Sequence, residues 1–439
     1  MDIFNADLHV HSPYSIAVSK TLNLDTMLET CKKKGLNVLG TGDILQPNWL
    51  KYMETNLEKD KQNCFSYKKV YFILQTEIED KENIHHIVLF PDFNSVREVQ
   101  KKLESRSKNV LGEWGGRPRV NSSPVELVEI ITDSGALIGP AHAFTPFKSI
   151  FRQGKFKNLE DCYENAINKI HFIELGLSAN TDLADQLDCL KNVSFLSNSD
   201  AHSQDPRTLG REFNKFEIEE PSFEEISLAI RRKDGRKITL NVGLHPKLGK
   251  YYNMFCSKCR RRVLFKKPKK ELDTSFNSLS ITNEFIIYYS NEPLSAKEKF
   301  IIQVSKNKAV CPACKEELNK SYKIKLGVSE RIDIISSYDK PKHPDHRPPY
   351  INAIPLIDII RSVKGIKSIN SKTILNEYNN IIKELGTEFE ILIDTPINEI
   401  ENYNKHIASV IKAFRNNEIE YVPGGGGKYG NINIDVEKQ

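Results

Sequence analysis

The first two hundred residues carry a series of histidines and carboxylates, each placed where a β-rich stretch ends. They are His9, His11, Asp43, Glu77, His86, His142, Asp200 and His202. In a βα fold the carboxyl ends of the strands meet at one mouth, so residues far apart in sequence become neighbours there. Unrelated core or surface histidines, the alternative, have no reason to follow this placement. The pattern therefore predicts a metal centre, with Asp200, His9, His11 and Glu77 as its catalytic members.

Helix-like and strand-like stretches alternate through the same region, which predicts an α/β fold. Helical spacing covers residues 24–34 and 124–133. The expected strands cover residues 37–39, 70–75, 84–90, 136–140, 171–175 and 193–197. This repeated βα rhythm favours a barrel-like arrangement of the strands.

The donor types of the cluster indicate its chemistry. Mixed imidazole and carboxylate ligands suit zinc, manganese or iron, and a carboxylate such as Glu77 can bridge two ions. Bound ions of this kind activate water and stabilise negative charge on a phosphoryl oxygen, so phosphoester hydrolysis is the expected reaction. Amide hydrolysis is the alternative, because amidohydrolases also place His-x-His at a barrel mouth. Those enzymes usually add a bridging lysine, for which the sequence offers no clear candidate.

Other polar residues of this region receive supporting roles. Because neighbouring side chains of a strand point to opposite faces, we expect His85 to point away from His86 and to be structural or on the surface. Glu174 is a candidate for a residue that supports the ligands from behind. Lys20, Arg207 and Arg211 are candidate phosphate contacts, although most cationic side chains simply solvate the surface.

Four of the eight cysteines form two Cys-x-x-Cys pairs, Cys256 with Cys259 and Cys311 with Cys314. Two such pairs can close a tetrahedral zinc site. The 51 residues between the inner cysteines exceed the usual ribbon spacing of about 15–20, so we expect an insertion between the pairs. Redox activity is the alternative, but neither pair follows a thioredoxin-like strand. The other four cysteines are isolated, which fits free thiols in a reducing compartment.

A basic tract begins inside the first cysteine pair. It holds eight lysines and arginines between residues 258 and 270, with aromatic residues on both sides. Interleaved cations and aromatic rings are typical of nucleic-acid binding, whereas a solvated basic loop is the alternative. Arg260 and Arg261 of this tract are therefore candidate DNA contacts, as is Lys428 of the glycine-rich tail. The tail is not a Walker loop, because Tyr429 follows Lys428 where that motif needs serine or threonine.

Length and charge set the domain organisation. With 439 residues, 39% of them hydrophobic, the chain can form two or three domains. We expect a catalytic domain over residues 1–250, a zinc-binding four-cysteine module over 251–328 and a mainly helical, DNA-binding domain over 329–439. The helices of that last domain are expected near 351–363 and 373–385. The net charge is only +5, so nucleic-acid binding must come from local clusters. A leader or membrane-spanning pattern is not found, which predicts a cytoplasmic protein.

The catalytic motifs resemble those of the polymerase and histidinol phosphatase (PHP) superfamily over residues 1–250. The matching segments are His9-x-His11, Thr41-Gly42-Asp43, Glu77, His86, Ala141-His142 and Ser199-Asp200-Ala201-His202. This resemblance implies a distorted βα barrel with seven strands and up to three metal ions. One departure is that Asp43 stands where many members have a histidine.

The order of the parts resembles the endonuclease Q family over nearly the whole chain. The segments that carry this resemblance are His346-Arg-Pro-Pro-Tyr350, Pro423-Gly-Gly-Gly-Gly-Lys-Tyr-Gly430, Ala141-His-Ala-Phe-Thr-Pro146 and Glu174-Leu-Gly-Leu-Ser-Ala179. The resemblance implies a DNA repair endonuclease that nicks the strand 5′ to uracil, hypoxanthine, xanthine or an abasic site. We expect zinc in the cysteine site and in the catalytic cluster, with Mg²⁺ or Mn²⁺ supporting activity.

Two other hypotheses belong to different classes of protein. One is a PHP-type phosphatase that acts on a small phosphomonoester, although such an enzyme does not need the parts that follow residue 250. The other is a nucleic-acid-binding protein with a vestigial metal cluster, which the complete ligand set argues against.

Overall fold

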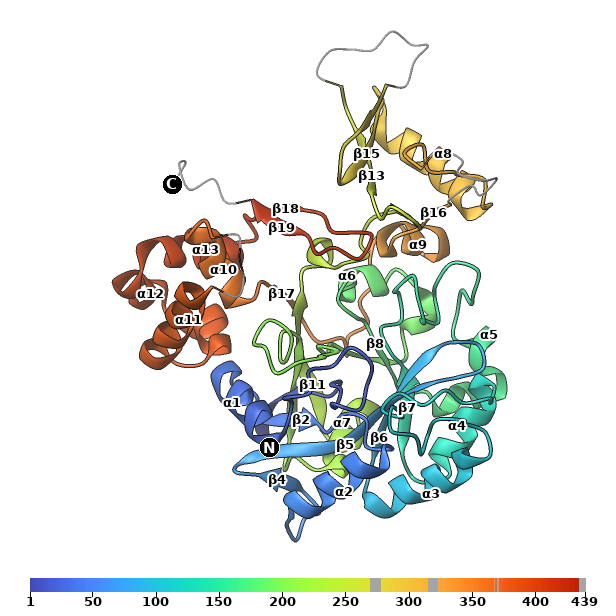
Figure 1. Cartoon of the computed structure of the whole chain (residues 1–439), viewed down its shortest axis with the longest axis vertical. Helices are drawn as coiled ribbons and strands as arrows, with labels where there is room; N and C mark the ends of the chain where they lie inside the picture. Colours follow the sequence, from blue (N-terminus) through green and yellow to red (C-terminus); the bar gives the residue numbers. More distant parts are fainter. Residues whose placement is uncertain (269–277, 315–322, 367, 369–370, 434–439) are drawn as a thin grey trace.

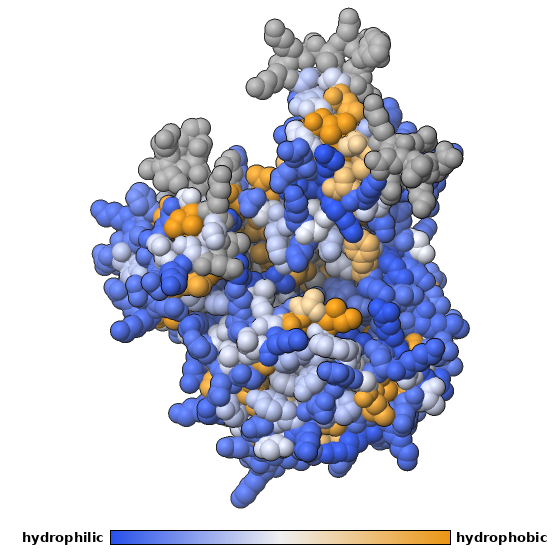
Figure 2. Space-filling model, viewed as in Figure 1, coloured by the Kyte–Doolittle hydropathy of each residue, from blue (hydrophilic) through white to orange (hydrophobic). Residues whose placement is uncertain are grey.

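The computed structural model describes residues 1–268, 278–314, 323–366, 368 and 371–433. Figure 1 shows a large lobe that contains the N-terminus, a small module drawn in yellow above it, and a group of C-terminal helices drawn in red beside it. The visible face is mostly hydrophilic, and its apolar atoms lie in separate small groups (Figure 2). Among the described residues, no helix is long and apolar enough to cross a membrane.

A ten-stranded mixed sheet forms the centre of the large lobe. Its strands are β1 (Asp2–Asp7), β2 (Val38–Gly40), β3 (Glu58–Lys59), β4 (Phe65–Tyr67), β5 (Val70–Glu79), β6 (His85–Phe90), β7 (Leu137–Pro140), β10 (Phe213–Ile218), β11 (Lys237–Leu244) and β17 (Tyr350–Ala353). Two further strands, β8 (Phe172–Glu174) and β9 (Ser194–Leu196), form a separate parallel pair. Strands β2, β6, β7, β8 and β9 are buried along their whole length, because elements cover both of their faces.

The α/β class is confirmed, and the predicted strands lie within a few residues of their observed positions. Their pairing differs from a purely parallel βα array. β1 pairs in parallel with β2, and β2 with β5, but β5, β6 and β7 pair antiparallel, as do β1, β10 and β11. Only five residues join β5 to β6, and so short a connection permits only a hairpin. Within the described residues, the strand pairing does not return on itself to close a ring.

Helices cover the sheet of the large lobe. They are α1 (Leu24–Lys34), α2 (Pro47–Asn56), α3 (Phe93–Glu104), α4 (Pro124–Thr132), α5 (Glu160–Tyr163), α6 (Thr181–Ala184) and α7 (Phe223–Arg231), with short 3₁₀ turns η1 (Glu164–Lys169), η2 (Asp188–Leu190) and η3 (Pro246–Leu248). The predicted helices at 24–34 and 124–133 are confirmed. α1 begins at the Asn23 capping box and ends at Gly35, whose φ of 85° favours glycine.

The four-cysteine module has its own five-stranded sheet, in the order β14-β15-β13-β12-β16. The strands are β12 (Phe255–Cys256), β13 (Arg262–Lys266), β14 (Leu279–Ile281), β15 (Phe285–Tyr289) and β16 (Ile324–Lys325), and helix α8 (Pro293–Ser305) packs beside them. β14, β15 and α8 lie between the two cysteine pairs, so the expected insertion is confirmed. Helix α9 (Val328–Ile335) follows the module, and its Val328 and Ile332 join the core of the large lobe.

The C-terminal lobe is mainly helical, as predicted. It contains α10 (Leu356–Val363), α11 (Lys372–Leu385), the π-helical turn η4 (Glu390–Asp394), α12 (Ile397–Tyr403), α13 (Lys405–Arg415) and a hairpin of β18 (Glu420–Val422) and β19 (Asn431–Asn433). The predicted helix near 351–363 starts later than expected, because residues 350–353 form β17 and pair with β11 of the large lobe. A single strand of apolar residues before a helix looks helical by periodicity alone.

A buried ion pair fixes the C-terminal lobe against the large lobe. Lys34 Nζ, at the end of α1, lies 2.8 Å from Glu388 Oε1, and both side chains are almost fully buried. Glu388 also accepts hydrogen bonds from the Tyr378 hydroxyl at 2.7 Å and from the Leu356 backbone N–H at 3.1 Å. The Glu388 carboxylate thus has partners in both lobes, and the position of the C-terminal lobe depends on it.

Replacing Glu388 by alanine is expected to destabilise the protein by about 3–5 kcal/mol, because it leaves the Lys34 ammonium buried without its counter-charge. The matched control is Lys33→Ala, which breaks only the exposed pair of Lys33 with Glu29 and is expected to cost at most about 0.5 kcal/mol. Urea denaturation followed by circular dichroism compares the two. Equal, small losses in both variants would show that the buried pair does not hold the lobes together.

Candidate metal centre

The predicted ligands converge at one end of the large lobe. His9 and His11 follow β1, Glu77 lies near the end of β5, and His142 follows β7. Asp200 and His202 follow β9, whose continuation runs beside that of β1 through a backbone hydrogen bond from His11 N–H to the Ala201 carbonyl at 2.9 Å. The structure therefore places these six predicted residues together, as the strand-end argument expects.

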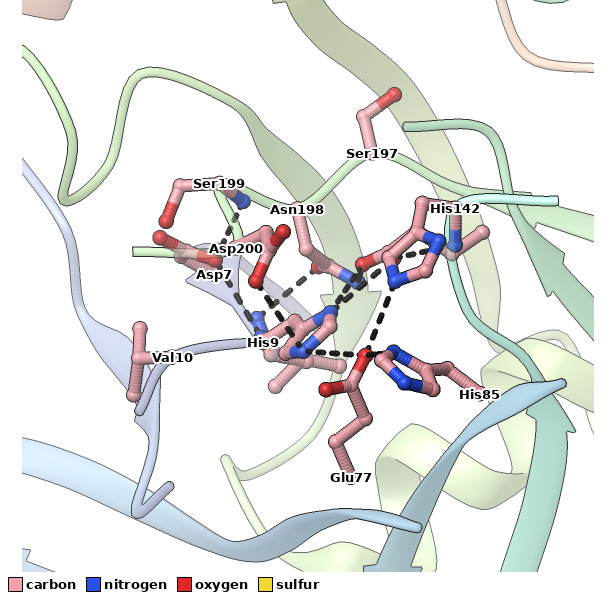
Figure 3. Close-up of polar contacts among 12 residues, drawn as sticks. Asp7, His9, Val10, Glu77, His85, His142, Ser197, Asn198, Ser199 and Asp200 are labelled. Carbon is pink, nitrogen blue, oxygen red and sulfur yellow. Dashed lines mark hydrogen bonds and ion pairs between the residues drawn. The ribbon is translucent and has the colours of Figure 1, made fainter. Parts of the chain in front are cut away.

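The buried carboxylate of Glu77 lies at the centre of the cluster (Figure 3). Its Oε1 lies 3.0 Å from His142 Nε2 and 3.7 Å from His9 Nε2, and its Oε2 lies 3.8 Å from His11 Nε2. Asp200 Oδ1 is 3.0 Å from His11 Nε2 and 3.7 Å from His9 Nε2. These side chains thus form one connected cluster instead of separate pairs.

The assignment of the two adjacent histidines of β6 must be corrected. His85, not His86, faces the cluster, and its Nδ1 lies 2.9 Å from Glu77 Oε1. β6 pairs antiparallel with β5 so that His85 stands opposite Glu79, which shares a face with Glu77, while His86 stands opposite Ile78. His86 Nε2 instead lies 2.9 Å from Asp80 Oδ2 in the buried interior. The two histidines point to opposite faces as expected, but which of them meets Glu77 depends on the hairpin register, which the sequence does not reveal.

Carboxylates behind the rings of His9 and His11 orient them. His9 Nδ1 lies 3.0 Å from Glu174 Oε1, and His11 Nδ1 lies 2.9 Å from Asp43 Oδ1. Both rings therefore turn their Nε2 atoms toward Glu77, the arrangement in which a carboxylate fixes a histidine for metal binding. The supporting role of Glu174 was anticipated. Asp43, predicted as a ligand, instead lies behind His11 and also accepts a hydrogen bond from Ser12 N–H at 2.6 Å.

Three residues of the site have a left-handed backbone conformation, which is unfavourable for residues other than glycine. The φ angles are 44° at Asp43, 31° at His142 and 49° at Asp200. Each such conformation costs on the order of 1–3 kcal/mol and persists only when the surrounding structure imposes it. The turns that follow β2, β7 and β9 are thus held in shapes that aim these side chains.

The electrostatics of the cluster favour added positive charge. Burial alone would lower the pKa of His9, but Glu174, Asp200 and Glu77 raise it to about 10. Burial likewise opposes the charged form of His11, and the carboxylates around it raise its pKa to about 9. Despite burial, the surrounding histidines hold the pKa of Glu77 well below its usual range. The carboxylates remain ionised and draw cations to this site.

Supporting residues that the sequence analysis did not single out hold the Asp200 loop. Asp7 Oδ1 accepts from Ser199 N–H and Asp7 Oδ2 from Gly210 N–H, each at 3.0 Å, and burial raises the pKa of Asp7 to about 6. Asn198 bridges the loop to the other side of the site, because its Nδ2 donates to Glu174 Oε1 at 3.0 Å. Asp7 stands at the end of β1, which is the one signal in the sequence that pointed to it.

Arg117 is a further residue that the sequence analysis missed. It lies in the loop between α3 and α4, and its Nη1 is 3.7 Å from Glu77 Oε2. Its side chain is 29% exposed, so the guanidinium faces both the cluster and the solvent. Gly115 and Gly116 precede it, and a glycine pair before arginine and proline is the only local signal of a special turn.

The donor atoms fit a multinuclear metal site. Three overlapping groups place one ligand atom from each residue within 4.8 Å of the others: His9, His11 and Glu77; His11, Asp200 and His202; Glu77, His85 and His142. Two buried atoms at the centre, His9 Nε2 and Glu77 Oε2, have no hydrogen-bond partner among the described residues. Leaving such atoms without a partner is costly in a protein interior, and a divalent cation would satisfy both.

Two predicted phosphate contacts, Arg207 and Arg211, lie on the loop that follows β9. Arg207 Nε donates to Asp205 Oδ1 at 2.8 Å. Arg211 Nη2 donates to the carbonyl oxygen of Ser199 at 2.9 Å, and its Nη1 donates to the Tyr429 hydroxyl. Arg211 therefore fastens the glycine-rich tail to the backbone beside the cluster. Direct binding of phosphate by either arginine stays a prediction.

The remaining candidate DNA contacts are distributed over the large lobe, the four-cysteine module and the glycine-rich tail. Lys20, Arg260 and Lys428 are exposed, and Arg261 is half-buried. The Arg260 guanidinium lies 5.6 Å from the ring centroids of Phe147 and Phe255, so cations and aromatic rings are interleaved there as predicted. Residues 269 and 270 of the basic tract lie outside the described residues.

The four paired cysteines come together in the small module. Cys256 Sγ lies 3.8 Å from Cys314 Sγ, and Cys259 Sγ lies 3.8 Å from Cys311 Sγ. All four sulfur atoms lie within 4.8 Å of one another, and none is part of a disulfide. A tetrahedron with Zn–S bonds of about 2.3 Å has edges of about 3.8 Å, so these separations fit a tetrahedral zinc site.

Solved structures of endonuclease Q are similar to this chain over almost its whole length. The lesion-specific endonuclease PfuEndoQ of Pyrococcus furiosus is 39% identical with a TM-score of 0.82, and the match covers 99% of this chain and 96% of that one. A structure of endonuclease Q with a 27-mer duplex substrate, with an abasic lesion at the active site, is also 39% identical. Its TM-score is 0.83, and the match covers 99% of this chain and 98% of that one.

Sequence comparison finds a relative with additional length. The uncharacterized protein MJ0043 of Methanocaldococcus jannaschii is 36% identical over 313 residues, which are 70% of this chain and 33% of that protein. This chain thus matches about a third of the length of that relative. The family described as the MJ0043 C-terminal domain matches residues 355–418, which contain α10 to α13.

The two histidines of β6 provide a matched test of the cluster. His85→Ala is expected to lower the metal content by about one ion per chain, because it removes a donor from the group formed with Glu77 and His142. His86→Gln is expected to keep the full content, since glutamine can still donate to Asp80. Metal content is measured by mass spectrometry after loading with Mn²⁺ and gel filtration. Loss of metal from the His86 variant alone would contradict the corrected assignment.

Proposed function

The chain belongs to the endonuclease Q family, and on this basis we propose that it is a DNA repair endonuclease. It is a metal-dependent hydrolase that cuts the phosphodiester on the 5′ side of a damaged nucleotide. Its substrates are duplexes that carry uracil, hypoxanthine or xanthine, or an abasic site. Damaged nucleotides of this kind pair weakly, so extruding them from the duplex costs less free energy than extruding a normal nucleotide. The lesion can therefore reach a buried site.

One observation carries the proposal. Four imidazoles surround the buried carboxylate of Glu77, and the central atoms His9 Nε2 and Glu77 Oε2 lack partners, in a chain that matches endonuclease Q from end to end. Without a metal ion, protonated histidines balance the carboxylates, but His9 Nε2 and Glu77 Oε2 stay buried without a hydrogen bond, which is costly in a protein interior. The residues are therefore arranged for divalent ions at the reacting phosphate.

The residues of the site have separate tasks in hydrolysis. When bound, divalent ions supply Lewis-acid activation of water and neutralise charge on a phosphoryl oxygen. Divalent ions would be held by His9, His11 and Glu77, by His11, Asp200 and His202, and by Glu77, His85 and His142. Glu174 and Asp43 keep the Nδ1 atoms of His9 and His11 occupied, so that only the Nε2 atoms face the reacting groups.

Arg117 is assigned to the phosphate itself. Its guanidinium lies 3.7 Å from Glu77 Oε2 in the cluster, and it is open to solvent on one side. A guanidinium binds two oxygens of a phosphate with parallel hydrogen bonds, which orients the scissile group. Arg117 thus adds charge stabilisation that the metal ligands do not provide.

The four-cysteine module, the ion identities and the domain limits complete the proposal. We assign zinc to Cys256, Cys259, Cys311 and Cys314, zinc to the catalytic cluster, and a supporting role to Mg²⁺ or Mn²⁺. The limits 1–250, 251–328 and 329–439 are kept, with β17 as a C-terminal addition to the catalytic sheet. The parallel bridge of Val10 with Ala201 joins the continuations of β1 and β9, which belong to different sheets. This link supports the proposal that the strands curve into a distorted, seven-stranded βα barrel of the PHP type.

An end-labelled duplex with one uracil, hypoxanthine or abasic site tests the proposed reaction. The expected product is a single nick on the 5′ side of the lesion that requires Mg²⁺ or Mn²⁺ and is absent from undamaged duplex. Asp200→Asn is expected to slow the nick at least about hundredfold, because it weakens a shared ligand. Asp161→Asn removes the same charge from the exposed surface of α5 and serves as control.

The opposite result of this assay is equally clear. No nick at any lesion, together with turnover of p-nitrophenyl phosphate, would replace the proposal with the alternative of a phosphatase for small phosphomonoesters. The metal centre would remain, because both reactions use the same ligands.

The cysteine site is tested by the zinc content of the protein. Cys314→Ser is expected to lower bound zinc by about one ion per chain, because a tetrahedral site needs four thiolates. Cys189→Ser changes a cysteine of the large lobe that belongs to neither pair and is expected to leave the zinc content unchanged. An equal zinc content in both variants would contradict the four-cysteine assignment.

A further inference from the structure

A large groove opens beside the metal centre, on the side of the loop between α3 and α4. Its volume is about 1010 Å³, at the upper end of the ~300–1,000 Å³ that a small-molecule site usually has. His85 of the metal cluster forms part of its wall, so the groove is continuous with the site. A groove of this size beside the metal centre has room for a segment of a polymer.

The wall of the groove is strongly cationic. Six lysine and arginine side chains line it, against two carboxylates. The cations are Lys81, Arg106, Lys108, Arg117, Arg119 and Lys148. Of the two carboxylates, Glu79 is already paired, because Lys148 Nζ lies 2.7 Å from it and His85 Nε2 lies 3.2 Å from it. Arg119 Nε lies 3.6 Å from the same Glu79 but is 70% exposed, and Arg106 Nη1 lies 3.8 Å from Glu126. Six cations against two carboxylates still leave the wall positive and suited to a polyanion, although the net charge of the whole chain is small.

Apolar side chains stand exposed at the same groove. Trp114 is 50% exposed and Ile16 is 64% exposed, and both line the wall. Lys20 Nζ lies 6.0 Å from the centroid of the Trp114 ring, which adds a cation next to an open aromatic face. An aromatic ring among cations is the arrangement on which bases of a nucleic-acid strand stack.

The loop that carries Trp114 is fastened to the metal centre. Gln46 Nε2 donates to the carbonyl oxygens of Gly112 and Glu113 at 3.4 and 3.5 Å. Gly116 lies so close to the cluster that a Cβ atom there would meet Asp43 Oδ2 at 2.8 Å. Arg117, one residue further, reaches Glu77. The groove and the cluster therefore have a fixed relative position.

We propose that this groove binds the DNA strand next to the scissile phosphate, with Lys108 and Arg119 on its phosphates and the ring of Trp114 stacked on one of its bases. Arg117 lies where the strand enters the cluster. The inference rests on the proposed function, because it takes DNA as the substrate. It adds a strand-binding surface on the catalytic lobe that is separate from the basic tract of the four-cysteine module.

The charge of the groove is tested by binding, without cleavage. The full chain carrying Asp200→Asn is titrated into a fluorescein-labelled duplex with an abasic-site analogue at several KCl concentrations, and anisotropy gives the affinity. Adding Lys108→Gln and Arg119→Gln is expected to weaken binding at least about tenfold, and to make the salt dependence shallower by about two phosphate contacts. The matched control is Arg231→Gln with Lys233→Gln, two exposed cations near the start of β11, at the opposite strand ends.

The position of Trp114 is tested by its own fluorescence. The chain has two tryptophans, and Trp49 is buried with 3% exposure, so DNA can quench Trp114 directly. Quenching on addition of the duplex to the Asp200→Asn protein is expected, and Trp114→Phe should abolish the signal while keeping affinity within about threefold. Trp114→Ala should weaken binding at least about fivefold, because it removes the stacking surface.

The outcomes separate this inference from the proposed reaction. The strand-binding groove would be overturned by unchanged affinity and salt dependence in the Lys108 and Arg119 variant, together with Trp114 fluorescence that does not respond to DNA. Specific nicking by the wild type would still establish the endonuclease. Conversely, absence of nicking at every lesion, with loss of DNA binding only in the groove variants, would support the groove and reject the proposed reaction. An equal loss in the Arg231 and Lys233 control would also overturn the inference, since any exposed cation would then contribute alike.

Discussion

The convergence of imidazoles on one buried carboxylate, Glu77, is the constraint on which the rest of the structure depends. Ionised groups gathered out of water are stable only when their charges are matched and their hydrogen bonds are made. Glu174 and Asp43 meet the outer nitrogens of His9 and His11, and the inner atoms are left for cations. The fully buried strands around them, and the unfavourable backbone angles at Asp43, His142 and Asp200, keep these side chains aimed at one point. The sheet is therefore a rigid support for a site of concentrated charge.

Contacts from distant parts of the chain hold the lobes and loops in place around the same site. Arg211 joins the backbone beside Asp200 to Tyr429 of the glycine-rich tail. The Lys34–Glu388 ion pair sets the C-terminal helices against α1. The loop of Trp114 and Arg117 lies directly against the cluster. A substrate that spans several nucleotides needs such parts at fixed distances from the reacting phosphate, because small displacements of a bound group cost much of the rate. The arrangement of the lobes is thus consistent with a polymer substrate.

Much of this organisation was predictable from the sequence, because hydrophobic periodicity and helix capping are local. The helix of residues 24–34 and the strands near Glu77 and His142 follow from such signals. The grouping of Cys256 and Cys259 with Cys311 and Cys314 follows from the Cys-x-x-Cys spacing. The exchange of His85 and His86 could not be foreseen, because the face of a strand depends on its partner's register. The same limit applies to the antiparallel pairing of β5 to β7 and to Asp43, whose position behind His11 is set by a left-handed turn. Arg117 was missed because single cations in loops are usually solvated.

Anomalous scattering from crystals of the protein grown with Mn²⁺ or Zn²⁺ tests the central claim most directly, since it locates ions without assuming an activity. The account predicts at least two ions, each about 2.0–2.3 Å from a Glu77 oxygen or a histidine nitrogen of the cluster, with His85 among the ligands and Glu77 shared between them. An ion bound by His86 and Asp80, or no ion within coordination distance of Glu77, would contradict it.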